Sequence, residues 1–411
     1  MVEHTRTRQG IKGQVIVVAV DIAKRGHWLL IQGPDGIREQ PRRIANTAAG
    51  FAALLAQAAA ARHRWPEAPL VVACEPTGHY WLPLAYWLQA RGVPVVTVNP
   101  AHTKRAKELE DNSPAKTDRK DLRVIADLVA AGRSRPCHLR TGVYATLRAL
   151  AMLRARVARD LTAVTNQLHQ LVDQLFPELL PCFGDDLRRA TCRRLLAVAP
   201  TPAAVQALGV ARLTALLRGA SRGRYGATLA ERLLAAAQTS IGIREGTAPL
   251  VARLTYLLDE DARLRAYRRA LERQQAAALE AVPYARALLA IRGLGVGTVA
   301  TLLGEAGDLR GYRRARQLLK LAGLNLYEIS SGEHQGQRRI TKRGRPGLRR
   351  ILYMAALRLL KRGAPYCGYY HRLRARVANT QAVVAVMRKL LRVVHALVHS
   401  GQAYDPVRLA A

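Results

Sequence analysis

Several residue types that mark particular classes of protein are scarce in this sequence. Its cysteines are odd in number and contain no CxxC pair: Cys74, Cys137, Cys182, Cys192 and Cys367. This pattern argues against a disulfide framework and against a structural zinc site. Aromatic residues make up only 5% of the chain, so stacking on unpaired bases is not expected to be the main mode of any nucleic-acid binding.

Long apolar runs and ATP-binding motifs are also absent. No run approaches the roughly 20 apolar residues of a membrane-spanning helix. The first residues, Met-Val-Glu-His-Thr-Arg, lack the apolar core of a signal peptide. No Walker-type GxxxxGK(S/T) motif occurs, so chemistry driven by ATP is not expected. These absences predict a protein of the reduced cytoplasm that has no membrane partner.

Acidic residues are few compared with basic ones. The 411 residues include 65 Lys and Arg against 29 Asp and Glu, which gives a formal net charge of +36. Such a charge opposes a compact state by self-repulsion unless a polyanion is bound. Nucleic acid is the expected partner, with binding that weakens steeply as salt is added. A membrane surface is the weaker alternative, and the length allows two or three domains.

Short β-branched runs alternate with helical patterns over the first third of the chain. The first run, residues 14–20, is almost continuously apolar, which is typical of a central strand buried on both faces. Further strands are predicted at 27–32, after a turn at 33–36, at 69–74 and at 94–98, and helices at 47–61, at 79–90, from 101 and at 117–131. The order βββαβαβα predicts a ribonuclease-H-like domain, a mixed sheet with helices on its faces.

The rest of the chain is predicted to be almost entirely helical. Apolar residues recur at spacings of three and four from 141 to about 180, as in a long helix or coiled coil. The stripe comprises Val143, Leu147, Leu150, Leu153, Val157, Leu161, Val164, Leu168, Leu171 and Leu175. A second long helix is predicted at 248–279, and two more, at 348–361 and 378–400, follow later. The fold class is therefore α/β plus α.

A glycine-rich stretch interrupts the helical pattern at 290–300. Gly293, Gly295 and Gly297 are spaced by two and precede a helix, like the hairpin of a helix–hairpin–helix element. Backbone N–H groups at such a helix start suit a phosphate, although the glycines could instead only let two helices pack closely. The patterns divide the chain into an α/β catalytic domain at 12–135, a helical coiled-coil region at 136–285 and a mostly α-helical C-terminal domain at 286–405.

Four carboxylates fall where the elements of the predicted sheet would bring them together. They are Asp21 at the end of the first buried strand, Glu75 after the strand at 69–74, and Asp118 with Asp121 on the following helical stretch. Helical side chains three residues apart share a face, with Cβ atoms about 5–6 Å apart. Like charges this close repel each other without a cation. The four therefore predict a site for two Mg²⁺ ions about 3.5–4 Å apart.

Each carboxylate also has a purely structural interpretation. Asp21 could be a helix N-cap or turn residue, and Glu75 could shape the turn at Glu-Pro-Thr-Gly. Asp118 and Asp121 could pair with the cations around them on a solvated face. Those cations include Lys116, Arg119 and Lys120, which are also candidates for nucleic-acid contact. Because all four carboxylates fall at points that one fold would bring together, the metal hypothesis is favoured.

A pair of serines precedes the most basic segment of the chain. Ser330 and Ser331 stand before Gly332 in a polar stretch, which most often forms only a turn. The cations that follow are Arg338, Arg339, Lys342, Arg343, Arg345, Arg349 and Arg350. They could neutralise a scissile phosphate while a serine hydroxyl attacks it, and a covalent phosphoserine would conserve the phosphodiester energy. A nucleic-acid clamp without chemistry explains the basic segment equally well.

The motifs around these residues resemble those of one family. The N-terminal third contains Val-Ala-Val-Asp21-Ile-Ala-Lys24, Cys-Glu75-Pro-Thr-Gly and Lys-Thr-Asp118-Arg-Lys-Asp121-Leu-Arg-Val-Ile-Ala. The C-terminal half contains Ile-Arg-Gly-Leu-Gly-Val-Gly-Thr, Leu-Ala-Gly-Leu, Ser330-Ser331-Gly332 and Ile-Thr-Lys342-Arg343-Gly344 with Leu-Arg349-Arg350. In this order they resemble the DEDD transposases of the insertion-sequence one-hundred-and-ten family, including its eleven-eleven subgroup, which are bridge-RNA-guided recombinases. Arg345-Pro346 departs from the family, which more often has Asn or Asp after the glycine.

The resemblance implies a RuvC-like N-terminal domain whose carboxylates surround Mg²⁺ and a C-terminal transposase domain whose serine attacks DNA. By the family pattern Ser331, directly before the glycine, is the nucleophile, and Ser330 is the alternative. The resemblance also implies a composite active site between protomers of a homo-oligomer, from dimer to tetramer, which the coiled coil helps to assemble. A noncoding guide RNA would pair with donor and target DNA in the bacterial cytoplasm, at the nucleoid.

We therefore expect an enzyme of a mobile element that cuts and rejoins DNA strands under RNA guidance. One alternative is a metal-dependent, structure-selective nuclease like a Holliday-junction resolvase, with water as the nucleophile and Ser331 in a structural role. The other is a basic RNA- and DNA-binding scaffold without catalysis. A covalent protein–DNA adduct would distinguish the first hypothesis from the second, and cleavage would distinguish both from the third.

Overall fold

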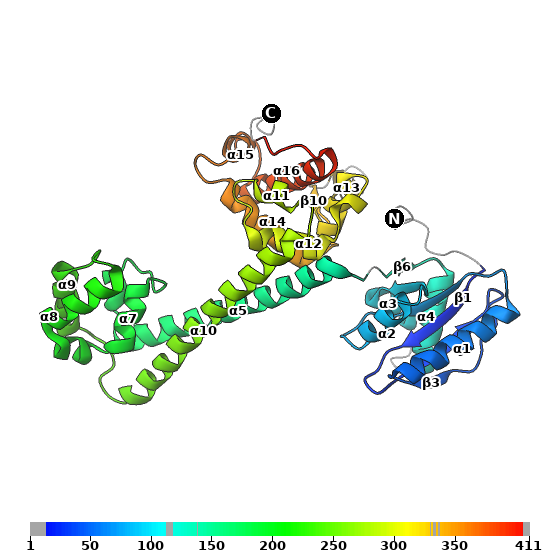
Figure 1. The fold of residues 1–411 in the computed structure, drawn as a ribbon, viewed down its shortest axis with the longest axis horizontal. Coiled ribbons are helices and arrows are strands. Elements are labelled where there is room, and N and C mark those ends of the chain that lie inside the picture. Colours follow the sequence, from blue (N-terminus) through cyan, green and yellow to red (C-terminus); the bar gives the residue numbers. More distant parts are fainter. Residues whose placement is uncertain are drawn as a thin grey trace. The chain divides into compact units, whose positions relative to one another are not determined.

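A computed structural model describes residues 14–111, 118–137, 139–328, 330–331, 334–335 and 338–405. The chain forms two compact units (Figure 1). Unit 1 comprises Met1–Thr141 with Arg310–Arg313, and unit 2 comprises Gly142–Leu309 with Arg314–Ala411. The sheet predicted from the N-terminal third lies in unit 1, and the long helices lie in unit 2.

Unit 1 is built on a six-stranded sheet with the order β3-β2-β1-β4-β5-β6. The strands are β1 (Ile16–Asp21), β2 (Gly26–Gln32), β3 (Arg42–Ala45), β4 (Leu70–Cys74), β5 (Val95–Val98) and β6 (Ser134–Pro136). The first three pair antiparallel, whereas β4 runs parallel to β1 and β5 parallel to β4. This mixed sheet is consistent with the ribonuclease-H-like prediction. The sequence pattern does not predict β6, because Ser-Arg-Pro has no apolar alternation.

Helices cover both faces of this sheet. They are α1 (Ala48–Arg64), α2 (Trp81–Gln89), α3 (Pro100–Asp111) and α4 (Asp118–Ala130). Alternate residues of a strand point to opposite faces, and the apolar run of β1 supplies both. Ile16, Val18 and Val20 pack with side chains of α1 and α2 in one core. Val17 and Ala19 pack with α4 in the other, so β1 is central and buried on both sides, as predicted.

The first part of unit 2 is a pair of long helices with a small helical insert. α5 (Gly142–Leu175) and α10 (Thr247–Glu280) pack along one another, and the insert lies at one end of the pair (Figure 1). The insert contains α6 (Leu179–Cys182), α7 (Ala190–Val198), α8 (Pro202–Ser221) and α9 (Ala227–Gln238). The predicted stripe of α5 is buried from Val157 to Leu175, but Leu153 is 38% exposed. There the buried residue is Ala151, since 3.6 residues per turn shift a strict repeat around the helix.

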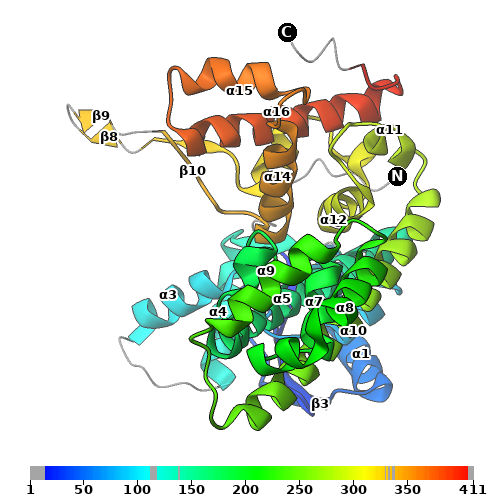
Figure 2. The ribbon, with the colours of Figure 1, turned by 90° about the vertical axis from the view of Figure 1, so that its left-hand side faces the viewer.

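The second part of unit 2 contains the C-terminal helices. They are α11 (Ala285–Leu289), α12 (Val296–Ala306), α13 (Ala315–Ala322), α14 (Pro346–Leu359), α15 (Cys367–Arg374) and α16 (Asn379–Ser400), and a short 3₁₀ helix, Leu309–Gly311, follows α12. Between α13 and α14, β7 (Leu326–Tyr327) pairs with β10 (Arg339–Ile340), and β8 (Ser330–Ser331) pairs with β9 (His334–Gln335). Figure 2 shows α15 lying along α16. The sequence pattern predicts α16 but not α15.

Within the described residues, no single helix has the length and apolar composition needed to cross a membrane. Only α7 and α8 taken together pass that test, and they are bent by 109°. Their apolar side chains, including Leu195, Val205 and Leu213, lie in the core shared with α5 and α10.

Candidate active site

Asp21 and Glu75 lie at neighbouring strand ends of the unit 1 sheet. β1 and β4 are parallel, and their pairing continues to the residue directly before each carboxylate. Ala19 and Ala73, two residues earlier, both face α4. Because side chains alternate between faces, Asp21 and Glu75 are directed toward that same α4 side. The predicted meeting of these two strand ends is therefore present in the fold.

The helix α4 carries the other two carboxylates to this side of the sheet. It begins at Asp118 and contains Asp121, whose neighbours Leu122 and Ile125 pack against the sheet. The Asp121 residue is only 7% exposed. Residues three apart share a helix face, which assigns Asp118 to the face of Asp121, although the Asp118 side chain lies outside the described residues.

Two residues of α3 that sequence reasoning missed contact these carboxylates. Thr103, 1% exposed, donates its hydroxyl to Glu75 Oε2 at 2.7 Å. Lys107 places its Nζ atom 2.5 Å from Asp121 Oδ1. Residues four apart lie on one helix face, so α3 presents Thr103 and Lys107 together to the carboxylate side of the sheet. The i, i+4 spacing from Thr103 to Lys107 was the one signal in the sequence, but a threonine and a lysine at that spacing are common on any helix.

The donor chemistry of the site suits a hard divalent cation. Asp21, Glu75 and Asp121 offer only carboxylate oxygens, the ligands that Mg²⁺ prefers. Within the described residues, no three His, Cys, Asp or Glu side chains lie close enough together to hold a metal ion, and the Asp118 side chain is not among those residues. The Lys107 ammonium partly balances the negative charge beside Asp121. The residues therefore fit Mg²⁺ in chemistry, and the complete set of ligands stays a prediction.

The cations predicted around Asp118 and Asp121 are only partly described. Lys116 lies outside the described residues, and of Arg119 only the backbone, within α4, is described. Lys120 is half-buried on the same helix. Asp121 pairs with Lys107 of α3, so the solvated-face interpretation does not account for this carboxylate.

The two serines lie in unit 2, in the short strand β8. There Ser331 is the register partner of His334 in β9, and Ser330 is the partner of Gln335. The structure describes the backbone at these four positions, and their side chains lie outside the description. The nucleophile, Ser331 or Ser330, therefore stays a prediction.

The basic segment after the serines divides into two groups. Arg338 pairs with Glu328 at 3.0 Å, and Arg345 lies 3.4 Å from Glu305. Arg349 donates to the carbonyl oxygens of Ala322 and Lys342, at 3.0 and 3.2 Å, and so ties α14 to the end of α13. The remaining cations are exposed and have no ion-pair partner within the described residues: Arg339, Lys342, Arg343 and Arg350. This second group is the better candidate for contacting phosphate.

Arg345, which departs from the family pattern, is tied to the packing of unit 2 by Glu305. Glu305 is buried on α12, 8% exposed, and pairs with Arg148 of α5 as well as with Arg345. Arg345 is the N-cap residue of α14 and makes no side-chain capping bond. A Cβ on Gly347, in the first turn of α14, would collide with Glu305 Oε1. A carboxylate is favourable at a helix N-terminus, so Glu305 supplies there the negative charge that Asp would provide.

Close packing of α12 on α5 depends on Gly304 rather than on the glycines of the hairpin. A Cβ on Gly297 would lie 2.7 Å from the Arg154 guanidinium of α5, and one on Gly304 would lie 2.8 Å from the Arg148 backbone. Gly293 adopts φ +100°, which a side chain disfavours. The contact at Gly297 is with the end of a flexible side chain, which can shift, whereas the contact at Gly304 is with backbone. A Cβ on Gly295, the N-cap residue of α12, would meet open space. Phosphate contact at this hairpin stays a prediction.

Comparison with known proteins places these features in one class, the transposases. A family model of IS110 DEDD transposases, described as "Transposase", matches residues 18–177. A second, "Transposase IS116/IS110/IS902 family", matches residues 285–371. The first match includes all four predicted carboxylates, and the second includes both serines and the basic segment.

Relatives that match most of the chain agree with the two family models. The chain is 28% identical to "Insertion element IS110 uncharacterized 43.6 kDa protein" of Streptomyces coelicolor, over 95% of each chain. It is 27% identical to "Insertion element IS900 uncharacterized 42 kDa protein" of Mycobacterium paratuberculosis, over 97% of this chain and 99% of the relative. It is 24% identical to "Transposase for insertion sequence element IS1111A" of Coxiella burnetii, over 66% and 60%. The chain belongs to the IS110/IS116/IS902 family of transposases.

Membership confirms the predicted resemblance, with the DEDD match in the N-terminal part and the IS116/IS110/IS902 match in the C-terminal part. A transposase acts on DNA, so DNA binding and strand cleavage or transfer follow for this chain. The excess of 65 basic over 29 acidic residues agrees with a polyanionic substrate.

Proposed function

We propose that this transposase cuts and rejoins DNA by attack of the Ser331 hydroxyl on a phosphate that the unit 1 carboxylates position through Mg²⁺. The observation that carries the proposal is that Asp21, Glu75 and the buried Asp121 are all directed to the α4 side of the sheet. Carboxylates at adjacent strand ends, with a third on the covering helix, suit a site for a divalent cation. Thr103 then orients Glu75 as an outer partner of a metal ligand does.

The chemical step is a transesterification. The Ser331 Oγ atom attacks phosphorus, a bond from Oγ to phosphorus forms, and one bond from phosphorus to a sugar oxygen breaks. The serine proton is lost to a base, and the released sugar hydroxyl gains a proton. The number of phosphate ester bonds is unchanged, so a second sugar hydroxyl can reverse the step and join a new strand. This balance agrees with the absence of an ATP-binding motif from the sequence.

The residues that would hold two Mg²⁺ ions are Asp21, Glu75, Asp118 and Asp121. The metal, when bound, supplies positive charge that stabilises the charge developing on the phosphate oxygens. Exposed cations of the basic segment, Arg339, Lys342, Arg343 and Arg350, would neutralise the flanking phosphates. Arg345 and Arg349 would act indirectly, by fixing the start of α14.

We further propose a guide RNA and a homo-oligomer as partners. The charge of +36 exceeds what one duplex contact requires and suits a complex with RNA and two DNA duplexes. The long helices α5 and α10 offer an extended surface for assembly of a dimer or tetramer. Base pairing between guide and DNA would then select donor and target.

The experiment that tests this proposal is trapping of a covalent protein–DNA adduct. Wild-type protein is incubated with Mg²⁺, the RNA transcribed from the element's end and labelled target DNA, then separated under denaturing conditions. We expect a protease-sensitive band that Ser331→Ala abolishes and Ser330→Ala retains. The reverse result would assign the nucleophile to Ser330.

Three outcomes would contradict parts of the proposal. Cleavage without any adduct would favour a nuclease that uses water, with Ser331 in a structural role. Full activity of a protein carrying both Asp118→Asn and Asp121→Asn would remove the metal hypothesis. Tight binding of nucleic acid without cleavage by wild type would favour the scaffold alternative.

A further inference from the structure

A pocket of about 600 Å³ lies on the C-terminal side of unit 2, away from the serine strand in sequence. Its lining comes from α16, from Tyr369 of α15 and from the segment 402–405 that follows α16. The volume lies within the roughly 300–1,000 Å³ typical of small-ligand sites. Neither matched family model extends to α16, since the second match ends at residue 371.

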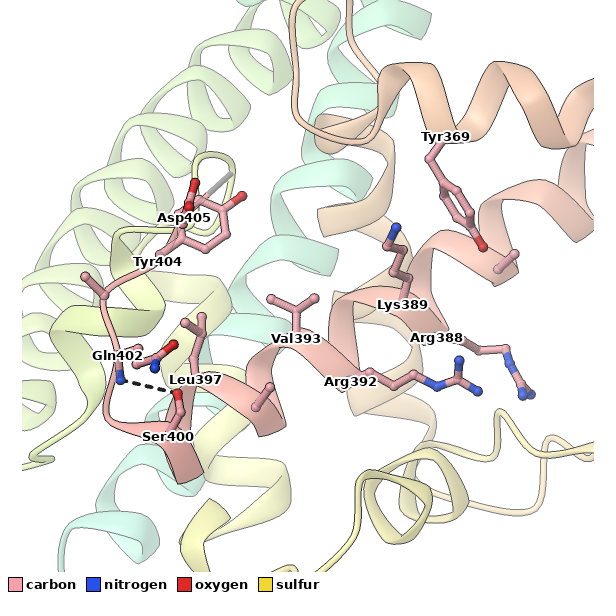
Figure 3. Close-up of a pocket in the computed structure, with 13 residues that line it drawn as sticks. Tyr369, Arg388, Lys389, Arg392, Val393, Leu397, Ser400, Gln402, Tyr404 and Asp405 are labelled. Atoms are coloured by element: carbon pink, nitrogen blue, oxygen red, sulfur yellow. Dashed lines mark hydrogen bonds between the residues drawn. The ribbon is translucent and has the colours of Figure 1, made fainter. Parts of the chain in front are cut away.

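Cations crowd one side of this pocket. Arg388, Lys389 and Arg392 project from α16 within five residues of one another (Figure 3). Burial lowers the pKa of Arg388, and the neighbouring Arg392 lowers it further. Burial also lowers the pKa of Lys389, with a contribution from Arg372. Like charges held together in this way are stabilised when an anion binds between them.

Aromatic, apolar and polar groups complete the pocket, and the polar groups are Ser400, Gln402 and the carboxylate of Asp405, which lies at the Tyr404 end (Figure 3). Tyr369 lies beside the cations and receives the Lys389 ammonium over its ring, 4.5 Å from the centroid. Tyr404 stands at the other end, beyond Val393 (Figure 3). The Tyr404 hydroxyl is buried and has no hydrogen-bond partner within the described residues. Val393 and Leu397 form an apolar floor between the two ends.

We propose that this pocket holds one unpaired nucleotide of a single-stranded nucleic acid. Its phosphate would lie against Lys389 and Arg392, and its base would lie over Val393 between Tyr369 and Tyr404. Because the Tyr404 hydroxyl is itself buried by protein, the base would contact the Tyr404 ring and not its hydroxyl. Cations next to aromatic groups are the usual means by which proteins bind single strands.

The combination favours an unpaired nucleotide over a duplex or a free anion. A duplex keeps its bases stacked inside, so it could place only phosphates against α16 and would leave the apolar floor empty. Inorganic phosphate would leave Tyr369, Tyr404 and the floor unused. The strand could come from a guide RNA or from unpaired DNA, which share this chemistry. The inference rests on the proposed function only in taking nucleic acid as the ligand.

The test is binding of short labelled oligonucleotides to the full chain, followed by fluorescence anisotropy. Oligouridine RNA, oligothymidine DNA and a duplex of equal length are titrated against wild type and Lys389→Gln/Arg392→Gln. The matched control, Arg212→Gln/Arg232→Gln, removes the same charge from exposed positions of the helical insert. Each phosphate contact to a single strand contributes about 0.7 to the slope of log affinity against log salt. Since both cations contact the same phosphate, we expect the pocket variant to lose about 0.7 of that slope, and the control less.

A second variant separates the base contact from charge. Tyr404→Ala should weaken single-strand binding on the order of tenfold, the effect of removing one stacking partner, and should leave duplex binding unchanged. Loss confined to oligouridine would identify RNA as the source, and loss confined to oligothymidine would identify DNA; either supports the pocket. The proposal is overturned if both pocket variants bind single strands as tightly as the control.

These readouts are independent of catalysis. Ser331→Ala should bind single strands like wild type, so failure of the adduct experiment would leave the binding result intact. Photocrosslinking of RNA that contains 4-thiouridine locates the residues that contact the single strand. Cross-linked peptides should contain residues 388–404, and cross-links found only elsewhere would contradict the assignment.

Discussion

The two units of this transposase position their candidate functional residues in different ways. In unit 1, strand ends and one helix direct Asp21, Glu75 and Asp121 to one side of a sheet. In unit 2, Lys342, Arg343 and Arg345 of the basic segment lie between β10 and α14, and they have separate roles. Arg345 pairs with the buried Glu305, whereas Arg343 remains exposed.

The difference shows when a sequence pattern is sufficient to locate a side chain. A strand or helix has a fixed period, so the direction of each side chain follows from its position in the element. A segment between elements has no such period, and each arginine there is directed by whichever acceptor lies nearby. The following predictions test this contrast, beginning with the largest expected effect.

Removing a carboxylate from the C-terminal ends of the central strands β1 and β4 should abolish activity without unfolding unit 1. We expect Glu75→Gln to lower adduct formation more than about 100-fold, since the loss of even an outer partner of a metal ligand costs about 10–100-fold in affinity or activity. The amide oxygen can still accept from Thr103, so the fold should persist. Unchanged adduct yield would show that the carboxylates at the ends of β1 and β4 are not the catalytic centre.

The next largest effect is expected from Thr103, the hydrogen-bond partner of Glu75. Thr103→Val keeps the shape of the side chain but removes the hydroxyl that donates to Glu75 at 2.7 Å. We expect the affinity for Mn²⁺, measured by calorimetry, to fall by about 10–100-fold. The control is Thr162→Val, whose hydroxyl donates only to a carbonyl of its own helix.

Lys107→Met tests whether the lysine ammonium and a metal ion take the same place beside Asp121. A bound divalent cation would take over the role of the ammonium beside Asp121, so this variant should not weaken Mn²⁺ binding. Weaker binding in Lys107→Met would show that the lysine supports the metal rather than replacing it.

Packing in unit 2 should be sensitive at the contact between α12 and α5. A Cβ on Gly304 would lie 2.8 Å from the Arg148 backbone, and we expect Gly304→Ala to destabilise unit 2 by about 1–3 kcal/mol. All four tryptophans lie in unit 1: Trp28, Trp65, Trp81 and Trp87. Helical circular dichroism should therefore shift on denaturation while tryptophan fluorescence does not.

A glycine in open space is the control for that variant. A Cβ on Gly219 in α8 would meet no atom within 4 Å, so Gly219→Ala should be neutral or slightly stabilising, because alanine is the better helix former. Equal destabilisation by both substitutions would contradict the close-packing interpretation of Gly304.

The smallest effect should be a pH dependence of unit 1. His27 is fully buried beside Phe51, and burial lowers the pKa of its imidazole below the usual 6.5, although Asn46 partly opposes this. The unfolded chain then binds the proton more readily. Stability should therefore be full above about pH 6.5 and decline below it, until the lowered folded pKa is reached, by at most about 1.4 kcal/mol per pH unit.

Tryptophan fluorescence during urea unfolding measures this dependence. His27→Gln, which does not titrate in this range, should flatten the stability of unit 1 as the pH falls below the ordinary histidine pKa. A wild-type curve that is already flat there would show that His27 keeps an ordinary pKa.

Much of unit 1 could be predicted because its elements are regular and apolar. The run at 14–20 was sufficient to identify β1 as central, and the spacing of Asp118 and Asp121 was sufficient to place them on one helix. β6 and α15 could not be predicted, since neither has an apolar period. Thr103 and Lys107 could not be assigned either, because the partner of each lies on another element far along the chain.

The sequence alone determined the family, the basic character and the order of the elements, because motifs, charge and periodicity are local properties of the chain. Only the tertiary structure decided which side chains meet. Pairing β1 with β4 and packing α3 and α4 on one face brought Thr103 to Glu75 and Lys107 to Asp121. Likewise, packing of α12 on α5 explained Gly304, and the buried Glu305 gave Arg345 a structural partner. Such contacts depend on distances between elements, which no local pattern specifies.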